Sequence, residues 1–155
     1  MILFLAFDGV LRPTWPCQEG TAFREVARLL AALEDHPPVE IVVTSSWRQL
    51  RHSSEWNDVP EALRARIVGH TPAISRRQYQ VYPVGYKPEP IWYMEILLYL
   101  KNTKQSDRPW IAIDDDERLF PADCPNLVSC KHGFGDEEQA ALRTQLQKSE
   151  SPRIW

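Results

Sequence analysis

Acidic and hydroxyl side chains occur at three points where short apolar runs end. Asp8 follows the run ILFLAF, Thr44 and Ser45 follow VEIVV, and Asp114 and Asp115 follow WIAI. Carboxylate oxygens are the ligands that Mg²⁺ prefers, while hydroxyl groups and backbone amides bind phosphoryl oxygens. These residue types are therefore the ones that a magnesium-dependent phosphate site needs.

Each of these features, taken alone, has a simpler explanation. An Asp-Gly pair after a strand is often only a turn, and an acidic run after a strand is often only solvated surface. Their occurrence in order, each at the end of an apolar run, favours the chemical interpretation. Lys87 lies ahead of a predicted helix and adds an ammonium group that can bind a phosphoryl oxygen.

The elements that must position these side chains alternate between strands and helices. Apolar runs predict strands at Ile2 to Phe7, Val39 to Thr44, Trp110 to Ile113 and Asn126 to Ser129. Apolar spacing and capping residues predict five helices, at Ala22 to Leu33 with Thr21 as N-cap, Ser45 to Leu50, within Val59 to Val68, Pro90 to Leu100 and Glu137 to Leu146. Residues 69–88 are rich in Pro, Gly, Tyr and Arg without clear periodicity, which predicts an irregular loop.

This alternation predicts an α/β fold, a three-layer Rossmann-like parallel sheet with helices on both faces. In such sheets ligands bind beyond the carboxyl ends of the strands, so we expect the three polar strand ends to meet at one crevice. A length of 155 residues fits one domain over residues 1–155.

Composition excludes several classes of protein. The hydrophobic share of 43% and charged share of 25% exclude a disordered or collagen-like chain, and a net charge of −3 argues against nonspecific nucleic-acid binding through a large basic field. Three scattered cysteines without a CxxC pair disfavour a disulfide scaffold or zinc module. The first apolar run ends at Asp8 and has no basic residues before it, so we expect a cytoplasmic protein without a membrane partner.

Over nearly its whole length the chain resembles the haloacid dehalogenase-like (HAD) hydrolase superfamily. Its first motif, an apolar strand followed by Asp-x-Asp-Gly-Val or Thr, corresponds to ILFLAFDGV, and its fourth, a strand ending in paired acids, to WIAIDDD. The second motif corresponds to Thr44 or Ser45 in IVVTSSWR, and the third to Lys87. The combination of FDGVL, SSWR and WIAIDDD is most similar to the small HAD domains of bacterial RNA-repair (Swiss Army Knife) proteins.

The resemblance implies a Mg²⁺-dependent phosphatase acting on a phosphomonoester. In the family, the first Asp of the first motif attacks phosphorus and binds Mg²⁺, and the second Asp protonates the leaving group and activates water. Carried over, Asp8 is the general acid/base and gives its backbone carbonyl to Mg²⁺, and Asp114 and Asp115 complete the metal site. Thr44 or Ser45, together with Lys87, binds the phosphate.

The chain departs from the family at Ala6, which occupies the position of the nucleophilic Asp. A methyl group can neither attack phosphorus nor bind a metal, so we expect turnover to be lost and phosphate binding to be partly retained. Two explanations are open. The substitution was engineered to trap substrate, which the intact remaining motifs favour, or the chain is a natural pseudoenzyme that serves as a phosphate-ligand or protein-binding module.

The spacing of the motifs also predicts an open site without a large cap. The segment from Leu11 to Gly20 is too short for a folded insertion, and Gln49 to Tyr86 can hold at most a small helical flap. An open site admits either a small phosphorylated molecule or a nucleic-acid end. Arg12, Trp47 and Arg48 are predicted to contact the substrate, because arginines hold phosphates and aromatic rings stack on bases. Nothing in the sequence indicates the oligomeric state.

Overall fold

The computed structural model describes residues 1–12, 23–36, 38–44, 54–75, 77, 85 and 88–150. Its centre is a five-stranded sheet in the order β3-β2-β1-β4-β5, in which every neighbouring pair of strands is parallel. The strands are β1 (Ile2–Leu5), β2 (Glu40–Val43), β3 (Ile67–His70), β4 (Trp110–Asp114) and β5 (Leu127–Ser129). The helices are α1 (Val26–Leu33), α2 (Glu61–Arg64), α4 (Ile91–Asn102) and α5 (Asp136–Glu150), with short 3₁₀ turns at Ser54–Asp58 and Glu117–Leu119.

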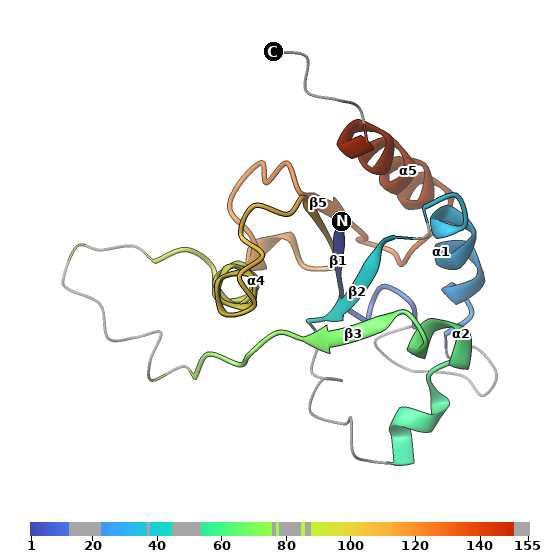
Figure 1. Cartoon of the computed structure of the whole chain (residues 1–155), viewed down its shortest axis with the longest axis horizontal. Helices are drawn as coiled ribbons and strands as arrows, with labels where there is room; N and C mark the ends of the chain where they lie inside the picture. The colour runs from blue at the N-terminus through green and yellow to red at the C-terminus, as the bar shows by residue number, and fades with distance from the viewer. Residues whose placement is uncertain are drawn as a thin grey trace.

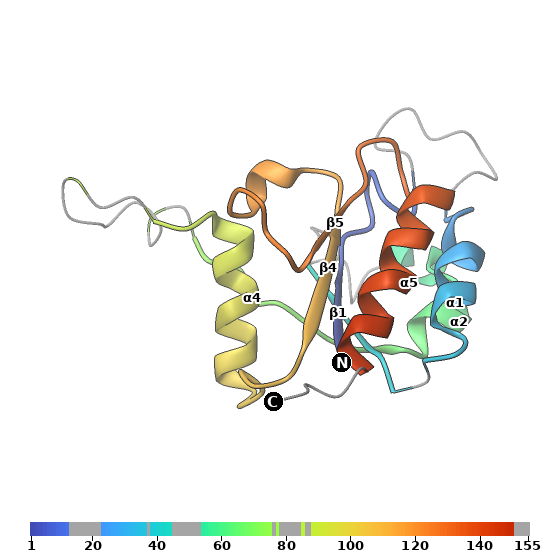
Figure 2. The ribbon, with the colours of Figure 1, turned by 90° about the horizontal axis from the view of Figure 1, so that it is seen from above.

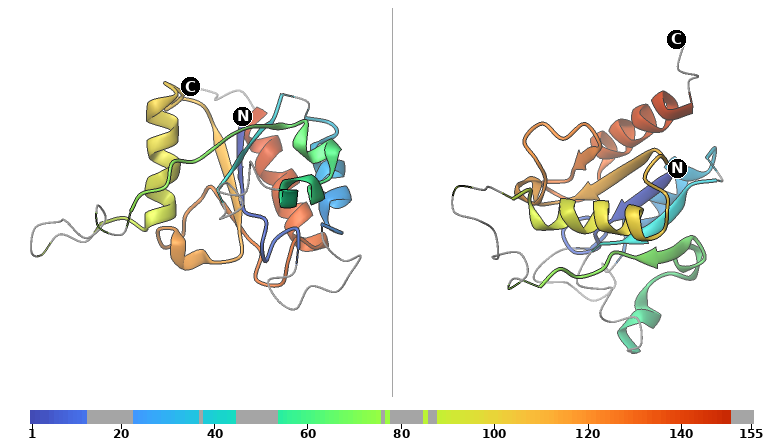
Figure 3. Two further views of the ribbon diagram at one scale, coloured as in Figure 1. Left: turned by 90° about the horizontal axis from the view of Figure 1, so that it is seen from below. Right: turned by 60° about the vertical axis from the view of Figure 1, so that its left-hand side comes forward.

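Helices cover both faces of the sheet, as predicted. Figures 1 and 2 show α4 on one face and α1, α2 and α5 on the other. The two further views in Figure 3 show the same three layers from other sides. No large cap is present in the described part of the chain. Within the same residues, no helix is both long and apolar enough to cross a membrane.

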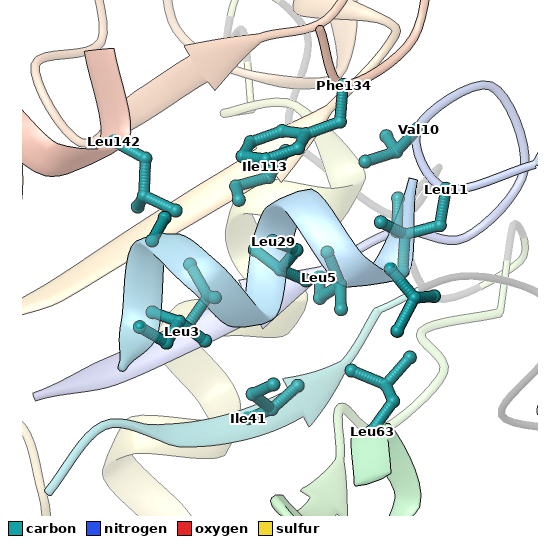
Figure 4. Close-up of a cluster of buried hydrophobic side chains, with 14 of the residues drawn as sticks. Leu3, Leu5, Val10, Leu11, Leu29, Ile41, Leu63, Ile113, Phe134 and Leu142 are labelled. Carbon is teal, nitrogen blue, oxygen red and sulfur yellow. The ribbon is translucent and has the colours of Figure 1, made fainter. Parts of the chain in front are cut away.

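The central strand explains why this sheet forms. All four residues of β1 are buried, and successive side chains of a strand point to opposite faces. Leu3 and Leu5 therefore join the core beneath α1 and α5, and Ile2 and Phe4 join the core beneath α4. Figure 4 shows the first of these clusters, in which residues from β1, β2 and β4 surround Leu29 of α1. An apolar run without alternation is what a strand between two helical layers requires.

One strand of the sheet was not predicted. We expected a helix within Val59 to Val68 and a loop after it, but the helix ends at Arg64 and residues 67–70 form β3 at the edge of the sheet. Ile67 and Gly69 are half-buried, while Val68 and His70 are exposed. A four-residue edge strand that contains a glycine carries too little apolar periodicity to be recognised.

The helix boundaries also differ from the prediction. Helix α1 begins at Val26 rather than Ala22, because Phe23 has a positive φ of 59° and packs edge-on against Phe7, with their ring centroids 5.7 Å apart. Pro90 is the N-cap of α4 rather than part of its first turn. The predicted N-cap Thr21 and the predicted helix over residues 45–50 lie outside the described residues.

Candidate functional site

The carboxyl ends of the three central strands bring Ala6, Thr44 and Asp114 together. The backbone amide of Ala6 donates to the carbonyl of Ile113 at 3.1 Å, and that of Thr44 donates to the carbonyl of Leu5 at 3.1 Å. The residues that follow β1 and β2 are therefore aligned with the last residue of β4. This edge of the sheet is where parallel α/β folds bind their ligands.

Asp8 lies in a tight turn that starts directly after Phe7. The carbonyl of Phe7 accepts a hydrogen bond from the amide of Leu11 at 2.9 Å, and the amide of Gly9 donates to the carbonyl of Arg12 at 2.8 Å. This turn brings the Arg12 guanidinium back onto Asp8, with Nε 3.2 Å from the carboxylate Oδ1. The predicted acid/base residue and one predicted substrate residue are therefore in direct contact.

Gly9 allows the paired acids after β4 to approach this turn. Its φ is +75°, and a Cβ atom built on it would lie 2.1 Å from the Asp115 carboxylate Oδ2 and 2.9 Å from the Asp115 Cβ. The Asp115 side chain therefore packs directly against the glycine backbone. A glycine is required here both by the backbone conformation and by the space that the carboxylate occupies.

We expect Gly9→Ala to destabilise the fold more than a glycine replacement elsewhere. Gly85 is the matched control, because its φ of +89° carries the same conformational penalty while no atom of the described residues lies within 4 Å of the added methyl group. Gly85→Ala should lower the free energy of unfolding by about 1–2 kcal/mol, and Gly9→Ala by on the order of 3 kcal/mol or more. Urea unfolding measures both values, and equal losses would mean that Asp115 does not occupy this position.

Asp114 is the most deeply buried acid of the site, with 1% of its surface exposed. Its Oδ1 accepts a hydrogen bond from the Asp116 amide at 2.9 Å, but no donor among the described groups reaches its buried Oδ2 when the carboxylate is ionised. Burial, with smaller contributions from the negative charge of Asp115 and from a hydrogen bond between the protonated Asp114 carboxyl and the Asp115 carboxylate, raises the pKa of Asp114 to about 7. A buried oxygen without a partner is a position at which a cation or a proton is needed.

The residues present fit a hard divalent cation. No group of three His, Cys, Asp or Glu side chains is placed to hold a metal in the part of the chain that the structure describes. Mg²⁺ does not need such a group, because it keeps several waters and uses one or two carboxylates. The Asp114 Oδ2 and the neighbouring Asp115 carboxylate would be those ligands. Ala6 removes the third carboxylate that an Asp at this position would add.

Several predicted site residues lie outside the described residues, namely Ser45, Trp47, Arg48 and Lys87. Their assignments to phosphate or substrate remain predictions. Thr44 is described, and 4% of its surface is exposed. The structure therefore brings together Ala6, Thr44 and Asp114 at the strand ends, and Asp8 with Arg12 and Asp115 around the adjoining turn.

Three polar residues at the same edge were not recognised from the sequence. The amide of Thr71 donates to the carbonyl of Val43 at 3.0 Å, which places Thr71 after β3 and beside Thr44. It could not be found because β3 was not predicted. Ser129 ends β5 opposite Asp114, and Lys131 follows it. Ser129 and Lys131 could have been found by applying to the fourth apolar run the same rule, that polar residues at strand ends mark the site.

Comparison with known proteins adds one match. A family model described as the HAD domain in Swiss Army Knife RNA repair proteins matches residues 2–141. The matched range contains all five strands and every described residue of the candidate site. No curated protein sequence matches the chain.

Proposed function

The chain belongs to the family of HAD domains found in Swiss Army Knife RNA repair proteins, and from this we propose that its strand-end site is that of a Mg²⁺-dependent phosphomonoester hydrolase in which Ala6 blocks turnover. The observation that supports this proposal most strongly is the Asp114 carboxylate. It lies next to position 6 with one oxygen bonded and the other buried beyond the reach of any donor among the described groups. A purely structural aspartate at this position would be expected to have both oxygens satisfied.

Each residue of the site has a distinct role in this proposal. Asp114, Asp115 and the backbone carbonyl of Asp8 would hold Mg²⁺, which would supply positive charge to offset that of the phosphoryl group. Thr44, with the predicted contributions of Ser45 and Lys87, binds phosphoryl oxygens. The Asp8 carboxyl group donates a proton to the leaving oxygen, and its contact with Arg12 fixes its position in the turn after β1.

We propose a phosphorylated nucleic-acid end as the substrate. The family is described by its occurrence in RNA repair proteins, and no large cap encloses the site in the described part of the chain. An uncapped site can admit the end of a polymer, whereas a capped one favours a small molecule. Arg12 lies beside Asp8, where it can contact a phosphate of the strand.

The alternative function is that of a natural pseudoenzyme, which binds a phosphate ligand or a protein without turnover. It is favoured by Ala6, which is 2% exposed and belongs to the apolar core cluster. The response to an Asp at position 6 distinguishes a chain that was altered to trap substrate from a natural pseudoenzyme. The first should regain activity when Asp is placed at position 6, and the second should not.

Asp114→Asn tests the proposed metal site through stability. The unfolded carboxyl ionises near its usual pKa of 3.8, whereas the folded one stays protonated until about pH 7. Between these pH values the ionised unfolded state is favoured progressively, so the metal-free fold should lose up to about 4 kcal/mol as the pH rises from 4 to 7. Asn has no charge, and Asp114→Asn should therefore be more stable than the unaltered chain at pH 8 without metal.

Added Mg²⁺ should stabilise the unaltered chain at pH 8 and leave Asp114→Asn unchanged, because a ligand stabilises only the state that binds it. The exposed Asp107 precedes β4 at the opposite edge of the sheet, so Asp107→Asn is the matched control and should retain both the pH dependence and the response to Mg²⁺. Urea unfolding at pH 5 and pH 8, with and without Mg²⁺, measures these effects. An equal response to Mg²⁺ in Asp114→Asn would contradict the proposed site.

A further inference from the structure

A pocket of about 310 Å³ adjoins the strand-end site. It lies between the loop that follows β1 and the loop that leads from β5 into α5, and Figure 2 shows these two loops side by side. The amide of Phe134 donates to the carbonyl of Val10 at 3.0 Å and fastens one loop to the other. Gly9 and Asp115 belong to the pocket lining, so the pocket is continuous with the proposed phosphate site.

The side chains around this pocket are mostly charged. Three are cations, namely Arg12, Arg24 and Lys131, and two are carboxylates, namely Glu25 and Asp115. The imidazole of His132 also lines the pocket. Cations thus outnumber carboxylates here, although the chain as a whole carries a net charge of −3. The cations come from both walls, because Arg12 and Arg24 precede α1 while Lys131 follows β5. Such a lining fits an anionic group better than an apolar one.

Two of these cations have partners that a ligand can replace. Lys131 Nζ lies 3.3 Å from the Glu117 Oε1, and the two side chains are 64% and 54% exposed. Arg24 is 65% exposed and contacts Glu25, which also contacts Arg28. Exposed ion pairs contribute little to stability, so both cations can turn toward a phosphate at small cost. Glu25 keeps Arg28 as its partner when Arg24 moves.

We propose that this pocket is an anion subsite that binds the phosphodiester linkage next to the terminal phosphate of a nucleic-acid strand. The inference rests on the proposed function, because the pocket shares Gly9 and Asp115 with the site that would hold the terminal phosphate. The volume lies at the lower end of the range for ligand pockets, about 300–1,000 Å³, and so suits one nucleotide unit. Lys131 and Arg24 are the specificity-determining cations of this subsite.

The test measures binding to the unaltered chain, in which Ala6 prevents turnover. The probes are a uridine dinucleotide with a terminal phosphate at its 3′ or 5′ end, the matching uridine monophosphate, and uridine 3′,5′-bisphosphate, each titrated calorimetrically with Mg²⁺ present. We expect one form of the dinucleotide to bind about tenfold or more tightly than the monophosphate, because charge-assisted bonds to phosphate are strong. The double variant Arg24→Ala, Lys131→Ala should lose most of that preference and bind the monophosphate as before.

Lys148→Ala is the matched control, because Lys148 is also exposed but lies near the end of α5, beside a groove that also contains Trp110 at the start of β4. It should leave the dinucleotide preference unchanged.

Two results would overturn the subsite and leave the proposed function standing. The first is monophosphate binding without any preference for the dinucleotide, and the second is a preference that survives the double variant. If the bisphosphate binds as tightly as the dinucleotide, the proposal that the subsite binds a nucleic-acid strand is overturned, and a small bisphosphorylated substrate is favoured instead. Failure of all three probes to bind would overturn the proposed function and the subsite with it.

Discussion

Ala6→Asp is expected to convert the chain into a Mg²⁺-dependent phosphatase. Position 6 is bonded to β4 through its amide and lies beside Asp114, so an added carboxylate would be next to the proposed metal site, at the position where the family carries its nucleophilic Asp. Loss of a covalent nucleophile costs on the order of 10⁴–10⁶-fold in rate, and its restoration should return a gain of that order. Release of phosphate from nucleotides, phosphorylated oligonucleotides, sugar phosphates and phosphopeptides measures the gain.

The same substitution should be costly for stability when metal is absent. It places a third negative charge beside the buried Asp114 and the adjacent Asp115, where like charges at short range disfavour ionisation. We therefore expect Ala6→Asp to unfold at a lower urea concentration than the unaltered chain, and Mg²⁺ to reverse that loss. A stable variant that responds to Mg²⁺ but releases no phosphate from any substrate would favour the pseudoenzyme.

Asp8→Asn in the Ala6→Asp background is expected to lower kcat by about 10²–10⁴-fold. Asn is nearly the same size as Asp and can still contact Arg12, but it cannot donate a proton to the leaving oxygen or accept one from the attacking water. Phosphate release under single-turnover conditions measures the loss. Because the change affects proton transfer rather than binding, KM should change much less than kcat.

Asp107→Asn in the same background controls for the loss of one negative charge. Asp107 precedes β4 at the opposite edge of the sheet, and the variant should keep full activity. If Asp8→Asn and Asp107→Asn are equally active, Asp8 is not the acid/base residue. The contact between Arg12 and Asp8 would then serve only to hold the turn after β1.

The central part of the fold was predictable because its strands are buried on both faces. The run that became β1 is apolar throughout, and those that became β2 and β4 carry an ionisable residue only at one end, Glu40 and Asp114, which distinguishes them from amphipathic helices and exposed strands. Edge strand β3 has only alternate burial and includes Gly69, so its pattern is too weak to separate it from the preceding helix. The start of α1 depends on the contact between Phe23 and Phe7, which local sequence does not reveal.

The candidate site was predictable in part for a similar reason. Because parallel strands all end at the same edge, polar residues after β1, β2 and β4 had to reach one edge, as Thr44 and Asp114 do on either side of Ala6. The approach of Asp115 to Gly9 depends on the turn after β1 and could not be read from spacing. Lys131 lies far from Arg12 in the sequence, and the two meet at one pocket only because the loop after β5 is bonded to the loop after β1.

The most direct test of the proposed chemistry is acid-quench mass spectrometry of Ala6→Asp after brief exposure to a phosphorylated substrate. A phosphoryl adduct should appear on the peptide that contains position 6, only when Mg²⁺ is present, and never in the unaltered chain. Once formed, the adduct should decay more slowly when Asp8→Asn is added, because Asp8 is proposed to activate the water that releases it. Mg²⁺-dependent turnover by Ala6→Asp without an adduct at position 6 would contradict the covalent mechanism.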